Sequence, residues 1–138
     1  LKIRAMLREV TEIESIGDSC YNLARTINHK YRGNEDFTEK QYSHIHQMFQ
    51  LTDDALNQMV SLVEDEGHQV DVNKSFNLEN EINNYRSQLK NQNVLDVNNK
   101  EYDYQMGVHY MDLIGECEKL GDYIVNVVEA RTDMKEKK

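Results

Sequence analysis

The sequence contains no proline and no tryptophan, and only 6 of its 138 residues are glycine. Proline and glycine are the residues that disfavour a helix interior most strongly, so their scarcity favours long helices. The chain has 2 cysteines, Cys20 and Cys117, too few for the disulfide framework of a small secreted domain. Both fall on predicted core stripes, and we expect them to be buried free thiols.

Positive charge is also in short supply. The chain has 16 Lys and Arg against 25 Asp and Glu, which gives a net charge of −9. Nucleic acids and anionic membrane surfaces are bound by clustered Lys and Arg, so this balance argues against both partners. No run approaches the roughly 20 apolar residues of a membrane span, and we expect no direct membrane insertion of this segment.

The remaining sequence predicts four helices, over about 2–32, 37–65, 70–92 and 100–133, with the Asn-rich stretch 91–99 as a loop. A chain of this length suits one domain, here residues 1–138. Four helices with short links favour an all-α, antiparallel up-down-up-down four-helix bundle. The first helix carries an unbroken heptad seam, expected to face the core: Ile3, Met6, Val10, Ile13, Gly17, Cys20, Ala24, Ile27 and Tyr31.

Two stretches of the chain are nearly copies of each other. Both read Glu-x-aliphatic-Gly-Asp-x-x-x-Asn-aliphatic, and they span 14–23 and 118–127. A glycine inside a helix costs roughly 0.5–1 kcal/mol relative to alanine, and two acids four residues apart repel by about 0.2–0.5 kcal/mol. The chain accepts both costs twice. We therefore expect another backbone to approach closely at Gly17 and at Gly121.

The acids of the two stretches lie in the first and last helices, which are antiparallel neighbours in the expected bundle. Each stretch lies near the middle of its helix, so Glu14, Asp18, Glu118 and Asp122 are expected at the same level. Two interpretations stay open. The acids are solvated at the edge of a tight helix crossing, or they converge on a divalent ion, with Asn22 and Asn126 as supporting or helix-contact groups. An all-oxygen site suits Mg²⁺ or Ca²⁺, and Zn²⁺ and Fe are further candidates. No cofactor is established by the sequence.

The sequence lacks the usual signatures of a catalytic site. It has no Gly-rich phosphate loop, no nucleophile elbow and no Cys-x-x-Cys pair. Neither Glu14 nor Glu118 is followed three residues later by the histidine of a di-iron bundle. We therefore predict that the chain is not an enzyme.

The two stretches resemble the PhoU family, whose helices carry an acid-x-x-x-Asp pattern, with Gly directly before the Asp and Asn-aliphatic-Ala beginning four residues after it. The matching residues are Glu14, Gly17, Asp18, Asn22, Leu23 and Ala24 in the first stretch and Glu118, Gly121, Asp122, Asn126 and Val127 in the second, where Val128 replaces the alanine. In addition, Asn80-Glu81-Ile82-Asn83 with Arg86 and Leu89 resembles the third helix of PhoU-like domains fused to bacterial sodium/phosphate cotransporters.

The resemblance implies a cytoplasmic regulatory domain that modulates phosphate uptake by a sodium-dependent transporter. Its partner would be the transmembrane part of the same transporter, at the cytoplasmic face of the inner membrane, and a homodimer is a second possible assembly. The chain begins at Leu1 inside a helical pattern, and we expect a C-terminal fragment of such a longer protein. Two alternatives stay open, namely a metal-binding helical bundle and a purely structural dimerisation module.

Overall fold

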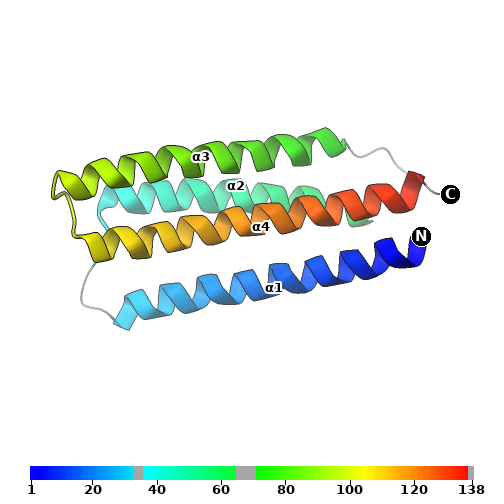
Figure 1. Ribbon diagram of the computed structural model, residues 1–138, viewed down its shortest axis with the longest axis horizontal. Coiled ribbons are helices and arrows are strands. Elements are labelled where there is room, and N and C mark those ends of the chain that lie inside the picture. Colours follow the sequence, from blue (N-terminus) through cyan, green and yellow to red (C-terminus); the bar gives the residue numbers. More distant parts are fainter. Residues whose placement is uncertain (33–35, 65–70, 137–138) are drawn as a thin grey trace.

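A computed structural model describes residues 1–32, 36–64 and 71–136. This part of the chain forms four helices, α1 (Lys2–Arg32), α2 (Glu39–Glu64), α3 (Val72–Asn98) and α4 (Tyr104–Glu136). Successive helices run in opposite directions, so both termini lie at the same end of the molecule (Figure 1). The all-α, up-down-up-down fold predicted from the sequence is confirmed.

Short polar side chains fix where the helices begin. Thr38 and Gln41 form a reciprocal capping box, in which each side chain accepts a hydrogen bond from the backbone N–H of the other residue, at 3.1 and 3.0 Å. Asp71 accepts from the N–H of Asn73 at the start of α3, and Asp103 accepts from that of Met106 at the start of α4. These caps satisfy amide donors that have no partner inside the helix.

The core lies between α2, α3 and α4. Its fully enclosed side chains include Met48 and Leu62 from α2, Ile82 from α3, and Ile114 and Val128 from α4. Each of these helices contacts the other two, so together they form a three-helix bundle with a common apolar interior. Burial of these aliphatic side chains supplies most of the stabilisation of such a bundle.

The first helix is attached differently. Within the described part of the chain, α1 contacts α4 and neither of the other two helices, and Figure 1 shows it along the free side of α4. The predicted orientation of its heptad seam is wrong, because that seam faces solvent. We call the exposed apolar face of α1 the outer stripe; it consists of Ile3, Met6, Leu7, Val10, Ile13, Gly17, Cys20, Tyr21, Ala24 and Ile27. The side chain of Tyr31 lies outside the described residues.

The connection between α3 and α4 also differs from the sequence prediction. The Asn-rich stretch 91–99 was expected as a loop, yet α3 continues to Asn98. Asp96 lies in this last part of the helix and is buried. Its burial keeps the segment helical, although Asp has a weak helix propensity. The tight turn that follows places Lys100 in the left-handed region, with φ of 59°.

Candidate functional site

The second motif of the sequence lies on α4 and faces α3. Gly121 is buried, and a Cβ atom at this position would lie 3.5 Å from Cδ1 of Ile82 on α3. This is an ordinary van der Waals distance, and the nearest atoms belong to side chains of α3. The predicted close approach of another backbone at Gly121 is therefore wrong. Glu118 forms an ion pair with Arg86 of α3, with Oε2 3.5 Å from Nε.

A pair of carboxyl groups lies one turn further along the same interface. Burial raises the pKa of Glu79 on α3, and a hydrogen bond with Asp122 of α4 and its negative charge raise the pKa further. The neighbouring Asp122 thus favours the protonated form of Glu79. The α3–α4 face is thus continuous and consists of Glu79, Arg86, Glu118 and Asp122. In this face each carboxylate of the second motif has a partner on α3.

An open groove of about 550 Å³ continues from this face toward the α3–α4 turn. Arg86 and Lys90 line its α3 side with positive charge, while Tyr104, Val108 and Met111 line its α4 side. Gly107 forms part of its floor, where the helices come closest: a Cβ atom there would lie 2.9 Å from Cγ2 of Val97. Asp112 also lines the α4 side, so the groove combines a basic α3 edge with a mostly apolar α4 wall that carries one acid.

The first motif has a different environment. Glu14, Gly17 and Asp18 lie on the exposed side of α1, and a Cβ atom at Gly17 would meet nothing within 4 Å. The expected close approach at Gly17 is therefore absent within the described residues. Since Glu118 and Asp122 face α3, the four predicted carboxylates are divided between two surfaces. The described residues contain no group of three or more His, Cys, Asp or Glu side chains placed to hold a metal ion.

The physical reason is the rotation of α1 about its own axis. Ile16 and Leu23 of α1 pack into the apolar core against α4. Polar side chains flank them and include Ser19, whose Oγ donates to Oε1 of Glu116 at 2.6 Å. Arg131 donates to the buried Glu9 at 2.8 Å, and Arg8 donates to Glu129 at 2.9 Å. These contacts turn the side of α1 that carries Glu14 and Asp18 away from α4.

The two motif asparagines do meet the opposite helix. Asn22 donates to Glu116 of α4 at 3.4 Å, and Asn126 donates to Glu12 of α1 at 3.1 Å. The predicted level of the motifs along the helix pair is thus correct, and both asparagines are helix-contact groups. Sequence reasoning missed Glu12 and Glu116. The available signal was that the repeat extends two residues toward the N-terminus, as Glu-x-Glu in both helices.

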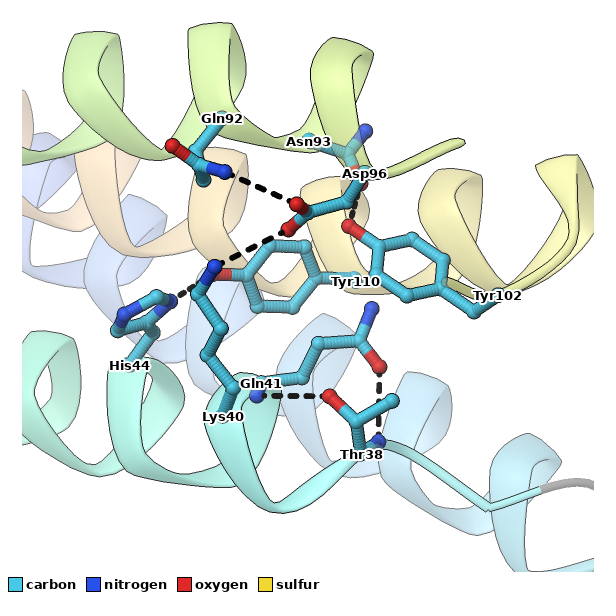
Figure 2. A network of polar contacts seen from close by, with 9 residues as sticks. All are labelled: Thr38, Lys40, Gln41, His44, Gln92, Asn93, Asp96, Tyr102 and Tyr110. Atoms are coloured by element: carbon cyan, nitrogen blue, oxygen red, sulfur yellow. Dashed lines mark hydrogen bonds and ion pairs between the residues drawn. The ribbon is translucent and has the colours of Figure 1, made fainter. Parts of the chain in front are cut away.

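A second polar cluster closes the end of the bundle where α2 begins (Figure 2). The buried Asp96 accepts from Gln92 at 2.9 Å and pairs with Lys40 at 3.6 Å. Nδ1 of His44 lies 3.1 Å from the hydroxyl of Tyr110, and burial together with Lys40 lowers the pKa of His44. The cluster ties α2, α3 and α4 together, and its polar groups largely satisfy one another.

The two cysteines occupy opposite environments. Cys117 is buried, and burial raises the pKa of its thiol to about 11, so it stays protonated at neutral pH. Cys20 is exposed, contrary to the prediction, because it belongs to the outer stripe of α1.

Comparison with known families decides the classification. The model of the PhoU domain matches residues 45–130, which is more than half of the chain. The chain belongs to the PhoU family. The match covers the α2–α3–α4 bundle from Ile45 onward and the whole α3–α4 face, whereas α1 lies outside it. No curated protein and no solved structure matches the sequence.

PhoU domains are regulatory helical bundles, and membership indicates a regulatory role in phosphate homeostasis without enzymatic activity. Within the described residues, none of the helices combines the length and hydropathy that a bilayer crossing requires. The functional question is therefore which surfaces the PhoU bundle offers to other molecules.

Proposed function

We propose that this PhoU domain is the cytoplasmic regulatory domain of a sodium-dependent phosphate transporter, and that it modulates phosphate uptake by contacting the transmembrane part of that transporter. The supporting observation is the use of the stretch 80–83 on α3. Ile82 is fully buried beneath Gly121, whereas Asn80 and Glu81 are exposed. Asn80 and Glu81, the polar half of the stretch that resembles transporter-fused domains, are thus not used in packing the fold.

The α3–α4 face gives this surface a defined shape. The ion pair of Arg86 with Glu118 and the contact of Glu79 with Asp122 join α3 to α4. A partner that binds Asn80 and Glu81 would therefore also contact the α3–α4 interface directly beside them. Regulation would consist of a change in how the domain docks, with phosphate supply shifting the population of the docked state.

The test uses the complete transporter in its own cells, with sodium-dependent phosphate uptake measured after growth at low and at high phosphate. Glu81→Arg reverses one exposed charge on α3 and is expected to abolish the difference between the two conditions. Glu101→Arg makes the same change at an exposed position in the α3–α4 turn and should leave the difference intact. Equal regulation in both variants, or a complete protein without membrane spans, would contradict the proposal.

A further inference from the structure

Two basic side chains of α3 line the groove between α3 and α4 and are little used by the fold. Lys90 is exposed and makes no ion pair or hydrogen bond with another described residue. Arg86 contacts Glu118 loosely, because its Nε lies 3.5 Å from Oε2 and has no hydrogen-bond partner. Two like charges four residues apart repel each other, and here they do so in a chain with a net charge of −9. The pair is therefore available to an anionic ligand.

Contacts across the groove fix which of its residues lie at the same level. Asn93 of α3 donates to the backbone oxygen of Gly107 of α4 at 3.5 Å, and Arg86 pairs with Glu118. The two helices run antiparallel, so a step toward the turn on one is matched by a step toward the turn on the other (Figure 1). Three pairs of groove residues are thereby placed level with each other, in order toward the turn: Lys90 with Asp112, Val94 with Val108, and Asn98 with Tyr104.

The groove changes in chemical character along its length. From Arg86 to Asn98 it extends over about 18 Å, at about 1.5 Å per residue of α3. Its first part is basic on α3, and its middle exposes the apolar side chains of Val94 and Val108, at 54% and 37%. The part next to the turn offers an aromatic ring, because the side chain of Tyr104 is 74% exposed. A ligand that fills the groove thus needs an anionic end and an apolar or aromatic end.

A phosphorylated nucleoside carries its chemical groups in this order. Phosphate forms charge-assisted hydrogen bonds with side chains such as Arg86 and Lys90. The Asp112 carboxylate repels phosphate but accepts hydrogen bonds from hydroxyl groups, which ribose has. Bases stack on exposed aromatic rings such as that of Tyr104. The exposed Asn98 amide beside this ring offers a donor and an acceptor to the polar edge of a base.

Simpler anions fit the groove less well. Inorganic phosphate would use the basic end and leave Val94, Val108 and Tyr104 uncovered. A fatty acid would place its carboxylate at the basic end, but its tail would then end against the Asn98 amide, and covering a polar group without a hydrogen bond is unfavourable. The groove volume of about 550 Å³ lies within the range of about 300–1,000 Å³ that is typical of small-molecule sites.

We propose that the groove between α3 and α4 is a binding site for a phosphorylated nucleoside. Its phosphates pair with Arg86 and Lys90. Its ribose lies beside Asp112, and its base stacks on Tyr104. The site does not require the transporter assignment, so this inference is independent of the proposed function.

The test is equilibrium binding to the complete protein, measured by titration calorimetry with the diphosphates of adenosine, guanosine, cytidine and uridine. We expect at least one of the four to bind. Inorganic pyrophosphate and the matching free nucleoside should bind more weakly by about tenfold or more, because each engages only one end of the groove. Absence of binding by all four diphosphates, or an affinity for pyrophosphate or the free nucleoside within about tenfold, would overturn the proposal.

Matched variants then locate the site. Lys90→Gln should weaken binding by about tenfold or more, because a charge-assisted hydrogen bond is lost, whereas Lys74→Gln changes an exposed lysine of α3 outside the groove and should have no effect. Tyr104→Ala should weaken binding by about 5-fold to 150-fold through lost stacking, and Tyr104→Phe should retain it.

Tyr21→Ala is the control for the ring, because it removes a 67% exposed tyrosine from α1 and should leave binding unchanged. Nucleotide binding that withstands Lys90→Gln and Tyr104→Ala would place the ligand outside the groove. Equal losses in the groove variants and their controls would show that general surface charge or exposed rings bind the ligand. Either result would overturn the proposal.

Discussion

The motif of α1 and the motif of α4 share their glycine, acids and asparagine, yet only the second lies inside the PhoU bundle. On α4 the glycine packs against Ile82 and the first acid forms an ion pair with Arg86, whereas on α1 the same positions face solvent. The difference shows that a motif determines which side chains a helix can pack against. The neighbouring helices determine whether that packing takes place. The comparison also separates two roles within the motif. The asparagine holds α1 to α4 in both copies, whereas the side of the helix that carries the glycine does not take part in this contact.

The largest expected difference between the two copies concerns equivalent aliphatic residues. Ile114→Ala should destabilise the protein by about 2–5 kcal/mol, because it leaves a cavity in a fully enclosed site. Val10→Ala at the corresponding position of α1 should change stability by less than about 0.5 kcal/mol. Urea unfolding of the two variants measures the difference. Similar losses in both would mean that the outer stripe is covered in the isolated chain.

The next effect concerns the contact that holds the two helices together near the N-terminus. Arg131→Met removes the partner of the buried Glu9 and should cost about 1–3 kcal/mol, because a buried carboxylate then lacks its hydrogen bond. The matched change Arg8→Met removes an exposed pair with Glu129 and should cost less than about 1 kcal/mol. Thermal melts compare the variants. Equal costs would show that burial of Glu9 does not govern this pair.

The reciprocal asparagine contacts should contribute equally. Asn22→Ala and Asn126→Ala each remove one side-chain hydrogen bond across the α1–α4 interface, at an expected cost of about 0.5–1.5 kcal/mol. The contacts lie about ten residues apart on each helix, so the double variant should show additive losses. Unfolding curves of the two single variants and the double variant test this. A much larger loss from one asparagine would show that the two contacts are not equivalent.

The glycines give a smaller effect of opposite sign. Gly17→Ala should stabilise the isolated chain by about 0.5–1 kcal/mol, since the new methyl group meets open space and helix propensity improves. Gly107→Ala provides the contrast, because its methyl group would press on Val97 and Asn93 and should destabilise the bundle. Chemical denaturation measures both. A destabilised Gly17→Ala variant would reveal a contact on the outer side of α1.

The last effect concerns Glu79 and appears in the pH dependence of stability. Burial and Asp122 raise the pKa of Glu79 in the folded state. Glu79 therefore binds its proton more tightly in the folded chain than in the unfolded chain. The stability contributed by this proton is present below the unfolded pKa and is lost as pH rises through the folded pKa. Glu79→Gln should therefore raise stability at pH 7 and lose this advantage near pH 4. Stability curves across this range provide the measurement, and an unchanged profile for Glu79→Gln would contradict the raised pKa of Glu79.

The sequence was informative wherever a residue pattern reports a local preference. The four helices and the common level of the two motifs follow from spacing and repeat position. The heptad seam of α1 correctly indicated a helix with an apolar face. It could not indicate the direction of that face, because periodicity records apolar positions and carries no information about which neighbour covers them.

The same limit explains the carboxylates. Spacing placed Glu14 and Asp18 at the level of Glu118 and Asp122, but the rotation of α1 depends on pairs such as Ser19 with Glu116 that join residues almost 100 positions apart. The extension of α3 through its Asn-rich end depends likewise on Asp96, which becomes acceptable in a helix once it is buried beside Gln92 and Lys40. Tertiary contacts outweigh local propensity at both places.

The attachment of α1 along a single neighbour has a consequence for how the molecule opens. Its backbone amides depend on the interface with α4 alone, whereas those of α2, α3 and α4 depend on an interior that three helices share. The two regions should therefore behave as separate cooperative units in native-state hydrogen exchange, with the α1 amides exchanging through openings that leave the α2–α4 unit intact. Any molecule that covers the outer stripe would slow the exchange of α1 first, and would thereby lengthen the time that α1 stays on α4.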